Sequence, residues 1–288
     1  MLWWQKKINR EGPGPRPLRE TPSPGESALL LGAVMALFLL LMFVLLELPG
    51  LSPAREGNWR FAGVLLVELI AVGLPVAVFI RVGRFAPGSV LGLRPCALAA
   101  LLGAVLMGVA TAVVAPQFEA WQAGLMEPPE GYLEALTDFI SIRERESLPW
   151  VLFCLALVPA LCEEALFRGI LLKACLARRG KLLTVIAVGL CFGLFHLDLW
   201  RAPILSIIGM LLTWTAIEAG SVWPAFVFHL VNNSVSLLLA NSSWPAQREW
   251  IDSAGDVPPV LFTTGALLLV AGAALVEWGK KGKRVRRE

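Results

Sequence analysis

The sequence predicts an all-α protein, a polytopic transmembrane helix bundle of about eight spans. Hydrophobic residues make up 57% of the 288 residues and charged residues only 16%, whereas soluble domains are about half apolar and a quarter charged. The apolar residues occur in runs of about 20, the length of a helix that crosses a bilayer. These runs cover residues 27–48, 61–80, 96–115, 148–172, 181–199, 202–219, 222–240 and 259–278.

The runs divide the chain into five regions. A polar segment at 1–26 precedes the N-terminal spans at 27–115, and an extramembrane connection follows at 116–147. Region 148–240 holds four spans, and 241–288 holds the last span and a basic tail. We expect no cleavable signal peptide, because the polar segment is rich in proline and glycine and the first apolar run is too long.

The connection at 116–147 contains apolar residues at helical spacing, namely Tyr132, Leu133, Leu136 and Ile140. This spacing predicts an amphipathic helix at the membrane interface. Two roles remain open for this helix: a solvated connector between spans, or a lid over a substrate entrance.

The distribution of positive charge predicts the orientation. With eight spans, the segments on the side of both termini hold eighteen Lys and Arg residues, and the opposite side holds six. Cytoplasmic loops of membrane proteins carry the excess of Lys and Arg. We therefore expect a multi-pass protein of the plasma (inner) membrane with both termini in the cytoplasm.

The fourth span contains three charged residues, Glu163, Glu164 and Arg168. A charged side chain at the centre of a membrane helix costs about 2.5 to 3.5 kcal/mol on insertion scales, so such residues are usually functional. Glu164 and Arg168 are four residues apart, share a face and can neutralise each other. Glu163 points about 100° away around the helix, which leaves it without a local partner.

The two histidines of the protein, His196 and His229, both lie in predicted spans. An antiparallel hairpin of the fourth and fifth spans places Glu163 and His196 at the same depth, because the turn lies midway between them. Gly189 and Gly193 form a small-residue face on the fifth span, which would permit the close approach of helices that this pairing needs.

Three sequence motifs resemble those of the CPBP family, which contains CAAX prenyl proteases and bacteriocin-processing proteins. The segment EEALFR matches the family's EExxxR, FGLFH matches FxxxH and HLVNN matches HxxxN, all in the family's order. The resemblance covers roughly residues 148–240, a third of the chain, and implies an intramembrane endopeptidase of glutamic or metallo type.

The resemblance also implies roles for the motif residues. Glu163 and His196 would activate a water molecule, and His229 and Asn233 would stabilise the oxyanion. The residues that support this site would be Glu164, Arg168 and Phe192. These roles agree with elementary chemistry, because a carboxylate beside an imidazole can act as a general base and two donors on one helical face can bind an oxyanion.

Several alternatives remain open at the level of the site. Asn232 could replace Asn233 as a donor, although the motif spacing favours Asn233. Glu163, His196 and His229 could instead hold a zinc ion, for which Glu and His are suitable ligands, but no HExxH motif is present. We therefore predict no cofactor and keep zinc as the alternative.

Other function classes compete with the peptidase. Intramembrane carboxylates and histidines also build proton relays in transporters, and a peptidase-like scaffold or immunity protein could bind peptides without cutting them. The expected partners are a membrane-associated protein or peptide substrate and the lipid bilayer, with no nucleic acid. Glu68, in the second span, is interpreted as a packing or cavity-lining carboxylate.

Overall fold

The computed structural model describes residues 17–47, 59–143, 146–242 and 257–285, which form helices and no β-strand. The all-α class and the polytopic architecture are therefore confirmed. In chain order the elements, with η for π-helical turns, are α1 (Pro24–Glu47), α2 (Trp59–Val67), η2 (Glu68–Gly73), α3 (Leu74–Val82), α4 (Pro87–Val90), α5 (Leu98–Leu125), α6 (Tyr132–Ile140), α7 (Leu148–Leu152), η3 (Phe153–Leu157), α8 (Val158–Glu164), η4 (Ala165–Leu171), α9 (Leu172–Leu176), α10 (Lys181–Phe195), α11 (Ala202–Ala219), α12 (Val222–Ala240) and α14 (Pro259–Val285).

Within the described residues, seven helices are long and apolar enough to cross a membrane. The fifth predicted span, 181–199, is wrong in its length, because α10 has only 15 residues and ends at Phe195. Such a helix is about 22 Å long, shorter than the hydrocarbon core of about 30 Å. His196 follows the end of α10 instead of lying within a span.

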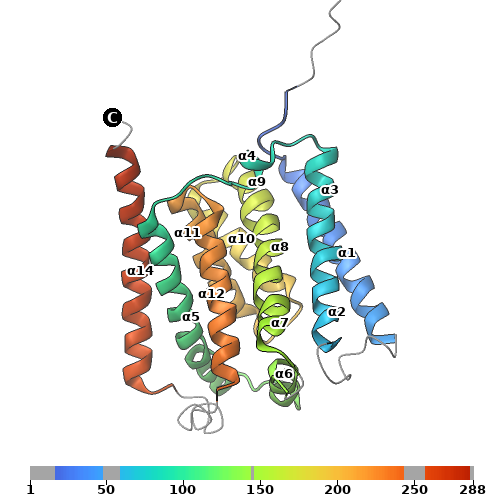
Figure 1. The fold of residues 1–288 in the computed structure, drawn as a ribbon, viewed down its shortest axis with the longest axis vertical. Coiled ribbons are helices and arrows are strands. Elements are labelled where there is room, and N and C mark those ends of the chain that lie inside the picture. Colours follow the sequence, from blue (N-terminus) through green and yellow to red (C-terminus); the bar gives the residue numbers. More distant parts are fainter. Residues whose placement is uncertain (1–16, 48–58, 144–145, 243–256, 286–288) are drawn as a thin grey trace, which may run out of the picture.

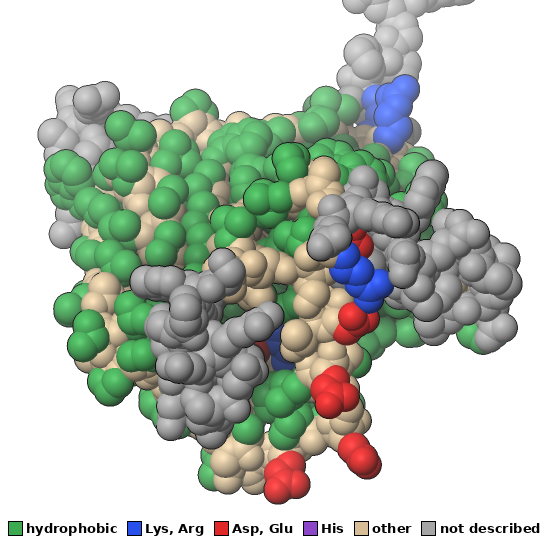
Figure 2. Space-filling model, turned by 60° about the horizontal axis from the view of Figure 1, so that its bottom comes forward, with side chains coloured by type: hydrophobic (Ala, Val, Ile, Leu, Met, Phe, Trp, Pro, Cys, Tyr) green, Lys and Arg blue, Asp and Glu red, His purple; other side chains and the backbone are tan. Residues whose placement is uncertain are grey.

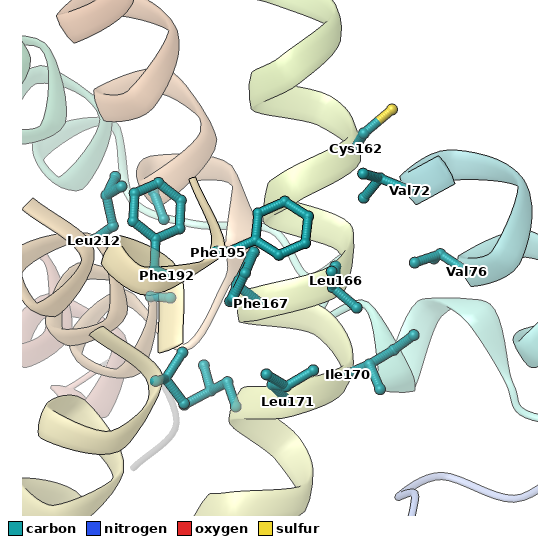
Figure 3. Close-up of a cluster of buried hydrophobic side chains, with 14 of the residues drawn as sticks. Val72, Val76, Cys162, Leu166, Phe167, Ile170, Leu171, Phe192, Phe195 and Leu212 are labelled. Carbon is teal, nitrogen blue, oxygen red and sulfur yellow. The ribbon is translucent and has the colours of Figure 1, made fainter. Parts of the chain in front are cut away.

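The central helix, which we define as Leu148–Leu176, comprises α7 to α9 and two π-helical turns. Its buried apolar side chains pack against several neighbours, as Figure 3 shows for one cluster. Phe167 of the central helix contacts Phe192 and Phe195 of α10, with ring centroids 5.2 and 5.4 Å apart. Leu166 belongs to the same cluster as Val72 of η2. The central helix is therefore held from both sides.

The helix α10 packs along α11 at small residues. A Cβ atom on Gly193 would lie 2.6 Å from the Ser206 backbone nitrogen, and one on Gly189 would lie 2.7 Å from the Met210 backbone nitrogen. These distances leave no room for a side chain. The small-residue face predicted on the fifth span thus exists, but it approaches α11 and not the fourth span.

The predicted connection at 116–147 is partly helical. The span predicted to end at residue 115 continues as α5 to Leu125, and the amphipathic helix predicted from residue spacing is present as α6. This helix lies at the lower end of the bundle in Figure 1. Leu133 on α6 remains half exposed, whereas Tyr132 and Leu136 are partly buried.

The first and the last described helices have their outer ends on the same side of the bundle. The helix α1 begins and α14 ends at the upper end of the bundle in Figure 1. The polar segment before residue 17 and the three residues after 285 lie outside the described residues. The chain therefore passes through the bundle an even number of times, and the short α10 counts as one of these passages.

Candidate active site

The predicted glutamates lie near the middle of the central helix, where the helical pitch changes. Glu163 and Glu164 end α8, and the π-helical turn η4 follows immediately. Such turns inside α-helices are frequently found at functional sites. Glu163, Glu164 and Arg168 are all buried, with at most 5% of each residue exposed.

Arg168, Glu164 and His229 form a buried chain of polar contacts. Nη1 of Arg168 lies 2.7 Å from Oε1 of Glu164, as their spacing predicted. The same carboxylate oxygen is 3.0 Å from Nδ1 of His229 on α12, a contact that the sequence reasoning missed. Arg168 also donates through Nη2 to the carbonyl oxygen of Gly209 on α11, at 2.9 Å. Three helices are therefore linked through Arg168 and Glu164.

Both imidazoles face the carboxylate of Glu163. Nε2 of His196 and Nε2 of His229 are each 3.9 Å from Oε2 of Glu163. This oxygen is buried and has no hydrogen-bond partner among the described residues. The antiparallel arrangement predicted for Glu163 and His196 thus brings the two side chains together, and it brings His229 to the same atom.

The contacts of the Nδ1 atoms assign the tautomers of both histidines. Nδ1 of His196 lies 2.9 Å from the carbonyl oxygen of Phe192, and a carbonyl can only accept a hydrogen bond. Nδ1 of His229 faces the Glu164 carboxylate, which also accepts. In the neutral form, each ring therefore carries its proton on Nδ1 and directs the lone pair of Nε2 toward Glu163.

Phe192 lies between the two histidines. Its ring centroid is 4.9 Å from that of His196 and 5.6 Å from that of His229, both in edge-to-face geometry. The guanidinium of Arg168 lies over the same ring, 4.5 Å from its centroid. Phe192 is almost fully buried. It therefore restricts the orientation of both imidazoles and of Arg168 by packing.

The two asparagines of α12 belong to a separate polar group. Thr111 of α5 is 2.8 Å from Oδ1 of Asn232, and Nδ2 of Asn232 lies 3.3 Å from Oδ1 of Asn233. Asn233 is half-buried, four residues after His229, so the two share a face of α12. Asn232 is thus engaged with α5, while Asn233 remains on the face of His229.

Glu68, which the sequence analysis interpreted as a packing or cavity-lining carboxylate, is a neighbour of the site. It begins the π-helical turn η2, is buried, and is close enough to Glu163 for their charges to interact. Its Oε2 has no hydrogen-bond partner among the residues described. The sequence did contain a signal for this role, because Glu68 is a single acidic residue in an apolar span.

Glu163, His196 and His229 are residue types that can bind zinc. Two ligands of a tetrahedral zinc at 2.0 to 2.1 Å lie roughly 3.4 Å apart, and Glu163 is 3.9 Å from each histidine. No group of three His, Cys, Asp or Glu residues in the described part of the chain is arranged to hold a metal ion. These distances fit a zinc ion less well than the residue types do.

The lower end of the molecule is hollowed. Figure 2 shows this end turned forward, with a recess near its centre and a basic side chain visible at the floor. Acidic side chains lie beside the recess (Figure 2). The side chain of His196 is 29% exposed, in contrast to the buried Glu163.

Comparison with known proteins gives a match for the part of the chain that holds the site. Residues 145–235 match the family model for type II CAAX prenyl endopeptidase Rce1-like proteins. No curated protein and no solved structure matches significantly. All seven predicted site residues lie within the matched segment, and the CPBP resemblance predicted from the three motifs is confirmed for it. The segment 145–235 is thus similar to the Rce1-like type II CAAX prenyl endopeptidases, a family of peptidases.

Proposed function

We propose that this protein is an intramembrane endopeptidase that hydrolyses a peptide bond of a membrane-associated protein or peptide, with water activated by Glu163 and His196. The observation that carries the proposal is the convergence of both Nε2 atoms on Oε2 of Glu163, at 3.9 Å each. A polar separation of this size suits a bridging water molecule. The family match supports the reaction class.

The first step is activation of water. A water molecule between Glu163 and His196 would donate one O–H to Oε2 of Glu163 and the other to the lone pair of Nε2 of His196. This leaves an oxygen lone pair directed at the carbonyl carbon of the substrate. Glu163 takes one proton as the water oxygen attacks, which is general-base catalysis.

The second step is stabilisation of the negative charge on the former carbonyl oxygen. Because Nδ1 of His229 is committed to Glu164, only the doubly protonated ring carries a proton on Nε2. The contact with Glu164 fixes the orientation of the His229 ring, and Arg168 holds Glu164 in place. The amide of Asn233 would supply the second donor of the oxyanion site.

The last step is cleavage. The tetrahedral intermediate collapses as the C–N bond breaks, and Glu163 returns its proton to the leaving nitrogen. The products are a carboxylic acid and an amine. Glu163 regains its carboxylate form when it gives this proton to the leaving nitrogen, and His196 keeps the same protonation state throughout.

The test compares membrane proteomes of cells that carry the wild-type protein, Glu163→Gln or His196→Gln. Both substitutions remove a reacting group but retain similar size, so the protein should insert and accumulate normally. We expect one uncut precursor to accumulate with each variant. Asp138→Asn, at an exposed position of α6, is the matched control and should process the precursor normally. Normal processing by Glu163→Gln would refute the proposed roles.

A further inference from the structure

The chain turns sharply directly after His196. Leu197 has a φ of 56°, in the left-handed region that residues with a side chain rarely adopt. Such a conformation persists only where neighbouring contacts hold it. The hydrogen bond of His196 itself is to Phe192 of the same helix, so the position of its ring depends on where this turn is held. We refer to residues 196–201 as the histidine loop.

Asp198 is the centre of the histidine loop. Its Oδ1 accepts from the backbone N–H of Arg201 at 3.0 Å, which closes the loop on itself. Its Oδ2 accepts from the hydroxyl of Tyr132, the first residue of α6. The ring of Tyr132 also packs on Trp200, with centroids 5.4 Å apart. One side chain of α6 thus contacts the loop both by hydrogen bonding and by packing.

The end of α5 supports the same loop. Nε of Arg201 lies 2.9 Å from Oε1 of Glu119, and the side-chain amide of Gln122 donates to the carbonyl oxygen of Trp200. Nε1 of Trp200 donates to the carbonyl oxygen of Met126 at 3.3 Å. All these partners lie at the end of α5 or directly after it, outside the segment that carries the three motifs.

The other end of α6 is also attached to the bundle. Nδ2 of Asn241 donates to the carbonyl oxygen of Ile140 at 2.9 Å, and its Oδ1 accepts from the N–H of Ile142 at 2.6 Å. Phe139 packs edge-to-face on Phe61 of α2, with centroids 6.4 Å apart. Because these contacts attach α6 to the bundle, the helix can support the histidine loop.

We propose that Tyr132 is a positioning residue for His196, acting through Asp198 to hold the histidine loop so that Nε2 of His196 faces Glu163. The inference rests on the proposed function, in which His196 works with Glu163. Burial and the hydrogen bond to Asp198 raise the pKa of Tyr132, so its hydroxyl remains a donor at neutral pH. The role is distinct from substrate binding, since Tyr132 acts only on the loop.

The first variant is Tyr132→Phe, which keeps the ring on Trp200 and removes only the hydroxyl. We expect the single-turnover rate of precursor processing to fall between tenfold and a hundredfold, because misplacing a catalytic group by about 1 Å can cost a hundredfold. The KM and the abundance of the protein should not change. Asp138→Asn on the same helix is the control and should keep the wild-type rate.

A second measurement does not depend on cleavage. Tyr132 is the single tyrosine of the protein, so incorporation of 3-fluorotyrosine into the full chain in nanodiscs, with a tyrosine-free tag, gives one ¹⁹F resonance. We expect Asp198→Asn to shift this resonance strongly and His196→Gln to shift it measurably, because coupling between two sites is reciprocal. Asp138→Asn should leave the shift nearly unchanged.

The outcomes separate this inference from the proposed function. An unchanged processing rate in Tyr132→Phe would overturn the positioning role and leave the proposed function intact. A ¹⁹F resonance that shifts in neither Asp198→Asn nor His196→Gln would do the same. A loss of abundance and thermal stability that accounts for the whole rate effect would reduce Tyr132 to a structural residue and also overturn it. Normal processing by Glu163→Gln would remove the proposed function, while the resonance would still decide whether Tyr132 and His196 are coupled.

Discussion

The two adjacent glutamates of the central helix have different surroundings and therefore different chemistry. Oε1 of Glu164 contacts both Arg168 and His229, so its charge is used to hold other groups. Oε2 of Glu163 faces two imidazole Nε2 atoms and has no hydrogen bond to the described residues. A difference of one position along the helix thus separates the supporting carboxylate from the proposed base.

Arg168→Met tests the supporting role. The substitution leaves the Glu164 carboxylate buried without its guanidinium partner, and breaking a buried ion pair in this way costs about 3 to 5 kcal/mol. We expect lower abundance in the membrane and a lower thermal unfolding midpoint of the purified protein. The double variant Glu164→Gln with Arg168→Met should regain abundance, because no unpaired charge remains.

The same double variant should still process precursor slowly, since Nδ1 of His229 loses the carboxylate that it contacts. A wild-type rate in the double variant would contradict the role assigned to Glu164. Wild-type abundance of Arg168→Met would contradict the structural importance of the ion pair.

Metal dependence is a further prediction about the site residues. We expect activity to persist after treatment with 1,10-phenanthroline, because a zinc ion held by Glu163, His196 and His229 would occupy both the proposed base and an oxyanion donor. Elemental analysis of the purified protein should give far less than one zinc per chain. Loss of activity in the chelator, recovery with added zinc and about one zinc per chain would establish the metallopeptidase alternative.

At the scale of elements, the pairing of α10 with α11 sets the position of His196. Gly193 lies three residues before this histidine, and a Cβ atom there would come within 2.7 Å of the Ala202 carbonyl oxygen as well as close to Ser206. The Ala202 oxygen and the nearby Ser206 nitrogen are backbone atoms, so the two helices must separate to admit a methyl group. Helix packing and the geometry of the active site are therefore coupled at Gly193.

Gly193→Ala is expected to lower both the thermal midpoint and the processing rate, because overpacking a tight contact typically costs about 1 to 3 kcal/mol. Gly32→Ala is the matched control: Gly32 also lies inside a membrane helix, but nothing is within 4 Å of the position its Cβ would take. The control should retain stability and activity. Equal behaviour of the two variants would show that the α10–α11 contact can relax freely.

At the scale of the whole molecule, the start of α1 and the end of α14 lie at the same end of the bundle (Figure 1). The excess of Lys and Arg in the segments of that side predicts that it is cytoplasmic. The opposite end, with α6, the histidine loop and the recess of Figure 2, would then face away from the cytoplasm.

Reporter fusions test this orientation. Alkaline phosphatase fused after Arg287 should be inactive, and green fluorescent protein at the same position should fluoresce, because the C-terminus is expected in the cytoplasm. A fusion after Met126, in the connection before α6, should show the reverse pattern. An active phosphatase at the C-terminus would overturn the predicted topology.

The sequence by itself determined the fold class, the approximate helix boundaries and the relative depth of Glu163 and His196. These features follow from quantities that can be read along the chain, namely the length of apolar runs, the rise per residue and the positions of charges. Lipid requires every span to satisfy its own backbone hydrogen bonds, so apolar runs of sufficient length become helices. The constant rise per residue then places residues equidistant from a turn at equal depth. The charges of Glu163, Glu164 and Arg168 stand out for the same reason, since an ionisable residue in an apolar span is costly.

Only the tertiary structure decided which side chains meet. Glu164 contacts His229, the small-residue face of α10 approaches α11, and Tyr132 reaches Asp198. Each contact joins residues on different elements, and it depends on helix rotation and on local features such as the π-helical turn η4 and the left-handed Leu197. Hydrophobic run length carries no information on rotation in a bundle, because packing between small residues and polar contacts between helices set it.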